Sequence, residues 1–231
     1  LWLRYYRPLR KYISRKQLFT HDAMKRLFQV NRDIFLRTLC LVAVTVFFTS
    51  TGAAFGDVVL AVNTLLMQLF TLFSYIMDGF AYAGEALTGK YIGAGNRQEL
   101  QRTIRHLFGW GIALSLAFTL LYGIGGKEFL GLLTNEQSVI SASGDYFYWV
   151  LAIPLAGFAA FLLDGICIGA TSTHIMLKAM VVASGSFFLI YYSLHNVLHN
   201  HALWLGFIVY LALRGIMQAL LLNSSSLRTA R

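Results

Sequence analysis

Charged residues are scarce in this sequence. Only 13% of its 231 residues are Asp, Glu, Lys or Arg, whereas 57% are apolar, and the mean hydropathy is +0.61. Soluble globular domains carry about 25% charged residues. The shortage of charge therefore argues against a soluble globular domain and indicates a polytopic membrane protein.

Cysteines and recognisable catalytic motifs are also scarce. The two cysteines, Cys40 and Cys167, lie in apolar stretches, where a thiol behaves as a small hydrophobe. His195, His199 and His201 have the spacing of metal ligands, but no Cys or acid lies near them in the sequence. The chain has no phosphate-binding glycine loop, serine nucleophile elbow or two-histidine zinc helix. We therefore expect no enzyme activity, no cofactor and no metal site.

Long apolar runs dominate what is present. A helix needs about 20 apolar residues to cross a bilayer, and six segments meet that length: about 34–55, 58–90, 104–125, 144–170, 175–195 and 201–223. Between the third and fourth, "GKEFLGLLTNEQSVISASGDY" has apolar residues every three or four positions, which predicts a short interfacial helix. The fold class predicted is an all-α membrane protein with six transmembrane helices.

The net charge of +9 is unevenly distributed. Residues 1–33 interleave Lys and Arg with aromatic and leucine residues, which predicts a basic amphipathic linker on the cytoplasmic leaflet. An RNA-binding arm is the alternative, although no partner other than the bilayer is needed to explain the charge. We expect residues 34–223 to form the membrane lobe and 224–231 to form a cytoplasmic tail.

Lysine and arginine also predict the orientation of the helices. The connections on the side of the N-terminal arm contain Lys90, Arg97, Arg102, Arg105 and Lys178, and the opposite loops contain almost nothing but Lys127. Basic loops stay in the cytoplasm. We therefore expect a multi-pass membrane protein with both termini cytoplasmic.

Three of the carboxylates in these apolar segments need an explanation. An Asp held ionised at mid-bilayer costs about 2.5–3.5 kcal/mol, so it must face a cavity, find a partner or stay protonated. Asp164 lies deep in the fourth segment, and its alternatives are a functional site or a buried, protonated structural acid. Asp78 and Glu85 are two turns apart on the second segment, about 10.5 Å along its axis and nearly on one face.

A polar stripe is predicted along the second segment. Asn63, Gln68, Thr71 and Tyr75 continue roughly the face that holds Asp78, and such a stripe would be costly against lipid. It is expected to face other helices or water. The alternative is that Glu85 pairs with Lys90 or Arg97 at the cytoplasmic interface while Asp78 bonds a neighbouring helix. Gly165 and Gly169, four residues apart, are predicted to be helix-packing sites.

Four stretches of the sequence resemble a known family. They are "VNRDIFLRTLCL", "AVNTLLMQLFTLFSYIMDGFAYAGEALTGKYIGAGN", "LLDGICIGAT" and "NHALWLGFIVYLALRG". They resemble the multidrug and toxic compound extrusion (MATE) transporters, most closely the branch named for DNA-damage-inducible protein F, over about residues 25–223. Those transporters have twelve helices in two six-helix lobes. The resemblance implies that this chain is a fragment corresponding to the C-terminal lobe, with the N-terminal lobe as its missing partner.

The resemblance also implies a function. It implies an antiporter that exports organic, often cationic, compounds by alternating access, driven by a cation gradient. Asp164 matches an Asp that sodium-coupled relatives use in cation binding, whereas Thr49 stands where many of them have Glu, which favours protons over sodium. We expect Asp164 to exchange a proton and Asp78 to tune the contact between helices. The residues expected to bind substrate and coupling cation are Asp164, Asp78, Thr49, Asn63 and Tyr75, and those expected in the gate region are Glu85 and Lys90.

Two other functions fit the same pattern. A lipid-linked oligosaccharide flippase of the same superfold should have several basic residues for a pyrophosphate, and within the predicted membrane region only Arg214 and the interfacial Arg37 could serve. A six-helix scaffold subunit would carry acids that serve only structural roles. Substitution of those acids would then affect stability alone.

Overall fold

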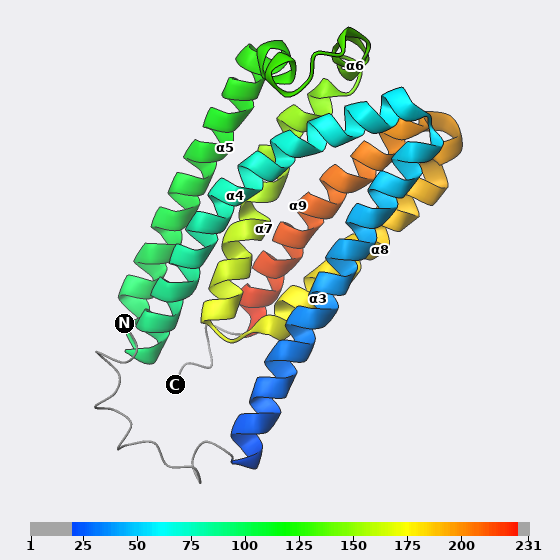
Figure 1. The fold of residues 1–231 in the computed structure, drawn as a ribbon. Helices are drawn as coiled ribbons and strands as arrows, with labels where there is room; N and C mark the ends of the chain where they lie inside the picture. Colours follow the sequence, from blue (N-terminus) through cyan, green and yellow to red (C-terminus); the bar gives the residue numbers. More distant parts are fainter. Residues whose placement is uncertain (1–19, 226–231) are drawn as a thin grey trace, which may run out of the picture.

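The chain folds into a bundle of long helices (Figure 1). The structure, a computed structural model, describes residues 20–225, and every regular element in that range is helical. The helices are α3 (His21–Ala54), α4 (Asp57–Gly93), α5 (Arg97–Leu133), α6 (Gln137–Ser143), α7 (Phe147–Gly169), α8 (Thr173–Leu198) and α9 (Asn200–Ser225). All except α6 are long and apolar enough to cross a membrane, which gives six candidate spans in the described range. The predicted fold class, all-α with six membrane helices, is confirmed.

Two predicted boundaries differ from the structure. Helix α3 begins at His21, so residues 21–33, which we assigned to the linker, are the start of the first helix. The rest of that linker, residues 1–19, and tail residues 226–231 lie outside the described residues. Helix α5 continues to Leu133 and includes the first part of the predicted interfacial helix, because no proline interrupts "KEFLGLL" and its apolar spacing stays helical. Only Gln137–Ser143 forms the short helix.

The bundle has two ends that differ in composition. At the basic end lie the start of α3 and the α4–α5 and α7–α8 connections, with Lys90, Arg97 and Arg102. At the opposite end, the α6 end, lie the α3–α4 and α8–α9 connections and α6 itself (Figure 1). Helix α7 packs against α4, α5 and α9, and α8 packs against α3 and α9. Figure 1 shows α3 and α4 adjacent at the α6 end and separating toward the basic end.

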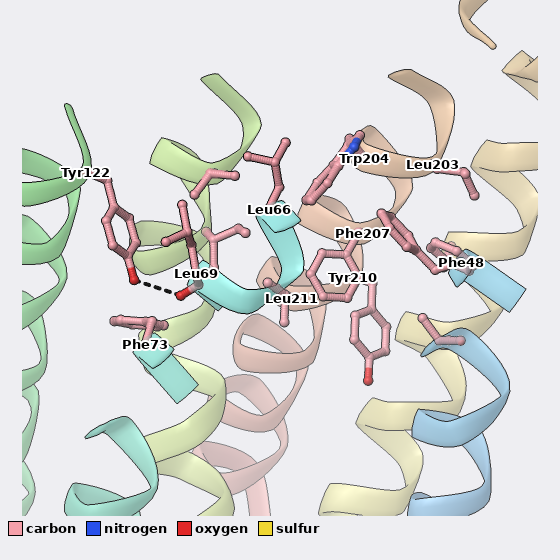
Figure 2. Packing of buried hydrophobic residues seen from close by; sticks show 14 of the residues in the cluster. Phe48, Leu66, Leu69, Phe73, Tyr122, Leu203, Trp204, Phe207, Tyr210 and Leu211 are labelled. Atoms are coloured by element: carbon pink, nitrogen blue, oxygen red, sulfur yellow. Dashed lines mark hydrogen bonds between the residues drawn. The ribbon is translucent and has the colours of Figure 1, made fainter. Parts of the chain in front are cut away.

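Aromatic side chains fill the interior between these helices. Phe48 of α3 meets Trp204 of α9 edge to face, with ring centroids 5.0 Å apart, and both side chains are fully buried (Figure 2). The buried Tyr122 hydroxyl of α5 donates a 2.7 Å hydrogen bond to the Leu69 carbonyl of α4. Lipid tails are as apolar as these side chains, so close packing and hydrogen bonds hold the helices together.

Glycines bring α4 and α7 into direct backbone contact. A Cβ atom at Gly165 would lie 2.0 Å from the Ala81 carbonyl oxygen, and one at Gly169 would lie 2.3 Å from that of Glu85. No larger residue fits at either position without moving a helix. The prediction that Gly165 and Gly169 are packing sites is confirmed, and the contact fixes α4 against the helix that carries Asp164.

A buried pair of amide side chains connects α4 to α9 at the α6 end. Asn63 of α4 and Asn200 at the start of α9 exchange two hydrogen bonds of 2.8 and 3.0 Å, and Trp204 Nε1 donates to Asn63 Oδ1 at 2.9 Å. Asn63, which we placed roughly on a polar stripe facing other helices or water, is therefore buried against α9. It lies one residue from Thr64, so its side chain is rotated by about 100° from the exposed part of that stripe.

Candidate functional site

One face of α4 is polar along most of its length. Its members are spaced alternately four and three residues apart, which keeps them on a single face of a helix. They are Thr64, Gln68, Thr71, Tyr75, Asp78, Tyr82 and Glu85, and each is exposed or half-buried. Tyr75 and Tyr82 are 72% and 69% exposed. We call this set the polar face of α4. Since a face with two carboxylates would be costly against lipid, it requires contact with water or with protein.

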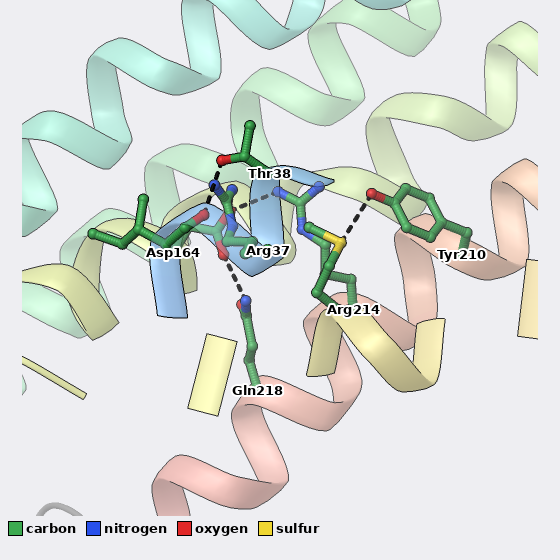
Figure 3. Close-up of polar contacts among 8 residues, drawn as sticks. Arg37, Thr38, Asp164, Tyr210, Arg214 and Gln218 are labelled. Atoms are coloured by element: carbon green, nitrogen blue, oxygen red, sulfur yellow. Dashed lines mark hydrogen bonds and ion pairs between the residues drawn. The ribbon is translucent and has the colours of Figure 1, made fainter. Parts of the chain in front are cut away.

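Asp164 lies beside this helix at the centre of a charged cluster (Figure 3). Its Oδ2 atom accepts hydrogen bonds from Arg37 of α3 and, at 2.7 Å, from Arg214 of α9. Its Oδ1 atom accepts a 2.6 Å hydrogen bond from Gln218 Nε2. Of the three possibilities for a mid-membrane carboxylate, the structure shows the one with partners. Both carboxyl oxygens of Asp164 therefore have hydrogen-bond partners.

Helical spacing explains why two of these donors, Arg214 and Gln218, lie on the same side of α9. Arg214 and Gln218 are four residues apart on α9, so both face α7. The Arg214 guanidinium also lies 5.2 Å from the centroid of the Phe161 ring, one turn from Asp164 on α7. Arg214 and Asp164 are 3% and 6% exposed, so the charges of this pair are largely removed from solvent. The cluster therefore ties α3, α7 and α9 together.

Asp78 is the fourth charged member of the site. Its half-buried carboxyl interacts electrostatically with Arg214, Asp164 and Arg37. Within the described residues the Asp78 carboxyl forms no hydrogen bond or ion pair. The Nε atoms of Arg37 and Arg214 are also buried without a hydrogen-bond partner among those residues. Two guanidinium charges thus face two carboxyls. The cluster is neutral when both acids are ionised and carries one positive charge when one acid is protonated.

The structure brings together some of the residues predicted from sequence. Asp164 and Asp78 belong to the same cluster, and Tyr75 lies one turn from Asp78 on the polar face. Thr49 and Asn63 line a separate cavity of about 150 Å³ between α3 and α4, toward the α6 end. The predicted binding residues therefore form two groups, connected by the polar face of α4.

The predicted gate residues lie nearer the basic end. Glu85 is half-buried on the polar face, and its backbone carbonyl contacts Gly169. Lys90 is exposed, and its Nζ atom lies 5.5 Å from the centroid of the Tyr91 ring. The alternative pairing of Glu85 with Lys90 is not formed among the residues that the structure describes. A gating role for either residue stays a prediction.

Sequence analysis did not assign Arg37, Arg214 and Gln218 to this site. We weighed the two arginines only as pyrophosphate ligands. A usable signal was present, because Arg214 and Gln218 have helical spacing in an otherwise apolar segment, and a buried arginine requires a carboxylate partner. Sequence alone could not show that α3 and α9 approach α7 at Asp164.

The described residues thus form a membrane bundle with a buried cluster of charged residues and a polar helix face. The MatE family model matches residues 34–192, and the chain belongs to this family. It is a multi-pass membrane protein.

The chain is similar to DNA damage-inducible protein F of Escherichia coli strain K12. The two are 39% identical over 199 residues, which cover 84% of this chain and 42% of that relative. The chain thus spans less than half the length of the relative. The predicted family and branch are confirmed.

Proposed function

We propose that this chain is one six-helix lobe of a proton-coupled antiporter that exports organic cations from the bacterial cytoplasm by alternating access with a second lobe. The observation that supports it best is the charge balance around Asp164. Two carboxyls and two guanidiniums meet beside a polar face that crosses most of the bundle. Membership in the MatE family supports an efflux function.

The charge balance provides a coupling mechanism. With Asp78 ionised the cluster is neutral, and an organic cation on the polar face is attracted to the Asp78 carboxylate. Protonation of Asp78 leaves the cluster with one positive charge, which repels the cation. Two unit charges about 6 Å apart interact by roughly 3 kcal/mol at an effective dielectric constant of about 20. Proton and substrate therefore exclude each other, as antiport requires.

This proposal changes the roles that we expected for the two acids. Asp164 was expected to exchange the proton, but both of its carboxyl oxygens already accept hydrogen bonds, from Arg37, Arg214 and Gln218. We assign proton exchange to Asp78, which has no hydrogen-bond partner among the described residues, and we assign Asp164 the role of holding both arginines. Protons are favoured over sodium because Thr49, which stands where many sodium-coupled relatives have Glu, is uncharged and lines a cavity separate from Asp164.

The flippase alternative is less well supported. A pyrophosphate site needs guanidinium groups free to bind phosphate. Arg37 and Arg214 both donate to Asp164, so a phosphate would compete with a buried carboxylate.

Transport by the full-length protein tests the proposal. Inverted membrane vesicles containing Asp78→Asn protein are expected to lose uptake of a fluorescent organic cation driven by a pH gradient. Asp145→Asn, an exposed acid at the α6 end, serves as the matched control and should transport normally. Normal gradient-driven uptake by Asp78→Asn would contradict the proposal, and wild-type uptake no greater than that of vesicles without the protein would favour a scaffold.

A further inference from the structure

A cavity of about 150 Å³ lies between α3 and α4, toward the α6 end of the polar face. Its polar lining comes from both helices: Thr45 and Thr49 from α3, and Asn63, Thr64, Gln68 and Thr71 from α4. No Asp, Glu, Lys or Arg is among its described lining residues. The cavity is therefore uncharged, unlike the cluster around Asp164, and its remaining lining, Phe48, Leu60 and Met67, is apolar.

The four threonines use their hydroxyl protons within their own helices. Each hydroxyl donates to a backbone carbonyl three or four residues earlier: Thr45 to Leu41 and Val42, both at 3.1 Å, Thr49 to Thr45 at 3.1 Å, Thr64 to Leu60 at 2.8 Å, and Thr71 to Met67 at 2.9 Å. A hydroxyl has one proton and two lone pairs. The oxygens can therefore accept further hydrogen bonds from a ligand but have no proton left to donate.

The amides add little donor capacity. Asn63 Oδ1 already accepts from Asn200 and Trp204, and Asn63 Nδ2 donates one of its two protons to Asn200. Gln68 is exposed and can turn its carbonyl oxygen toward a ligand. Acceptors thus outnumber donors on both walls of the cavity, which suits a group rich in N–H donors.

The cavity and Asp78 lie along the same helix face. Thr71 precedes Asp78 by two turns, about 10.5 Å along the axis. A linear molecule lying on this face can therefore place one end at the Asp78 carboxylate and the other among the threonine oxygens.

We propose that this cavity binds the N–H donors of an amine, and that the preferred substrates are elongated organic cations with a protonated primary or secondary amine about 10 Å or more from a second cationic group. The inference rests on the proposed function, because it names the substrate class for the same polar face. Quaternary ammonium groups carry charge but no N–H, so the cavity discriminates against them.

Two linear dications provide a matched pair of probes. Decanediamine has N–H donors at both ends, and decamethonium, its bis(trimethylammonium) analogue, has none. We would measure both affinities by isothermal titration calorimetry with the full-length protein in nanodiscs, without a gradient. Decanediamine is expected to bind about tenfold more tightly, since each hydrogen bond contributes about fivefold or somewhat less.

Threonine substitutions test whether the preference for decanediamine arises in this cavity. Thr49→Val with Thr64→Val keeps the side-chain shape but removes two acceptors, and is expected to reduce the preference to about twofold or less without changing decamethonium affinity. Thr38→Val is the control, because Thr38 is on the same α3 helix, makes the same bond to its own backbone and lies outside the cavity. Equal binding of the two probes, or a preference that survives the double substitution, would overturn the inference.

Asp78→Asn separates this inference from the proposed function. It is expected to weaken binding of both dications, and adding Thr49→Val with Thr64→Val to this variant should still lower the preference for decanediamine. Unchanged affinity for both probes in Asp78→Asn would count against the role of Asp78, whereas a preference that the threonine substitutions do not lower would count against the cavity alone.

Discussion

Arg214 of α9 and Asp164 of α7 form a buried ion pair with a donor–acceptor distance of 2.7 Å, and Arg37 of α3 binds the same carboxylate oxygen (Figure 3). Three helices thus meet at one acid. Burying charge without a partner is costly, so the pair and its neighbours have to be considered as a unit. Removing one member leaves the others with uncompensated charge.

Asp164→Asn is therefore expected to destabilise the protein. The variant keeps the size of the side chain but leaves two arginines without their counter-charge, and breaking a buried pair costs about 3–5 kcal/mol. The thermal unfolding midpoint in detergent measures this effect. Asp145→Asn removes an exposed acid and should leave the midpoint unchanged. Equal midpoints for both variants would show that the ion pair contributes nothing to stability.

Gly165→Ala tests the contact between α4 and α7. The added Cβ would overlap the Ala81 carbonyl, and backbone atoms cannot move aside as a flexible side chain does. We expect a loss of about 3 kcal/mol or more and a reduced yield of monodisperse protein in size-exclusion chromatography. Gly185→Ala is the control, because nothing lies within 4 Å of a Cβ at that position on α8. A normal yield from Gly165→Ala would mean that the helices are farther apart.

Asn63→Ala is expected to weaken the α6 end. The substitution removes the partner of Asn200 and Trp204, and each buried group left without a hydrogen bond costs about 1–3 kcal/mol. Hydrogen exchange should rise at the α8–α9 connection. Asn31→Ala provides the comparison, since that exposed side chain bonds only its own helix. Unaltered exchange in Asn63→Ala would argue against the amide pair.

The polar face of α4 is expected to contact water. In a protein without Cys40 and Cys167, cysteines replacing Tyr75 or Tyr82 should react quickly with a membrane-impermeant thiol reagent. Cysteines replacing Ile76 or Ala83, which are exposed on a different face, should react at least about tenfold more slowly, because thiolate forms poorly in lipid. Equal rates on both faces would show that the polar face is not a water-accessible path.

Hydropathy predicted the helices well because a bilayer imposes the length of each span. The exposed part of the polar face was also predictable, since Gln68, Thr71, Tyr75 and Asp78 follow helical spacing. The sequence could not show whether Asn63 faces another helix or water, because a buried amide pair and an exposed polar residue have the same sequence signal. Its partner Asn200 lies 137 residues away, and periodicity carries no information about such pairs.

The charged cluster was only partly predictable. The cost of an isolated carboxylate in a bilayer pointed to Asp164 and Asp78 as exceptional residues. Their relationship depends on how α3, α4 and α9 pack around α7, and Gly165 sets part of that packing through a contact with a backbone carbonyl. Such contacts depend on three-dimensional shape, which the spacing of polar residues does not encode.

The central claim is that Asp78 gives up a proton when an organic cation binds. Proton release on addition of saturating organic cation to the full-length protein in weakly buffered detergent, recorded with a pH-indicator dye, tests it directly. The wild-type protein and Asp145→Asn are expected to release protons, and Asp78→Asn is expected to release none while Asp164 stays paired. Release from Asp78→Asn equal to that of the wild type would contradict the account and assign the exchange to another group.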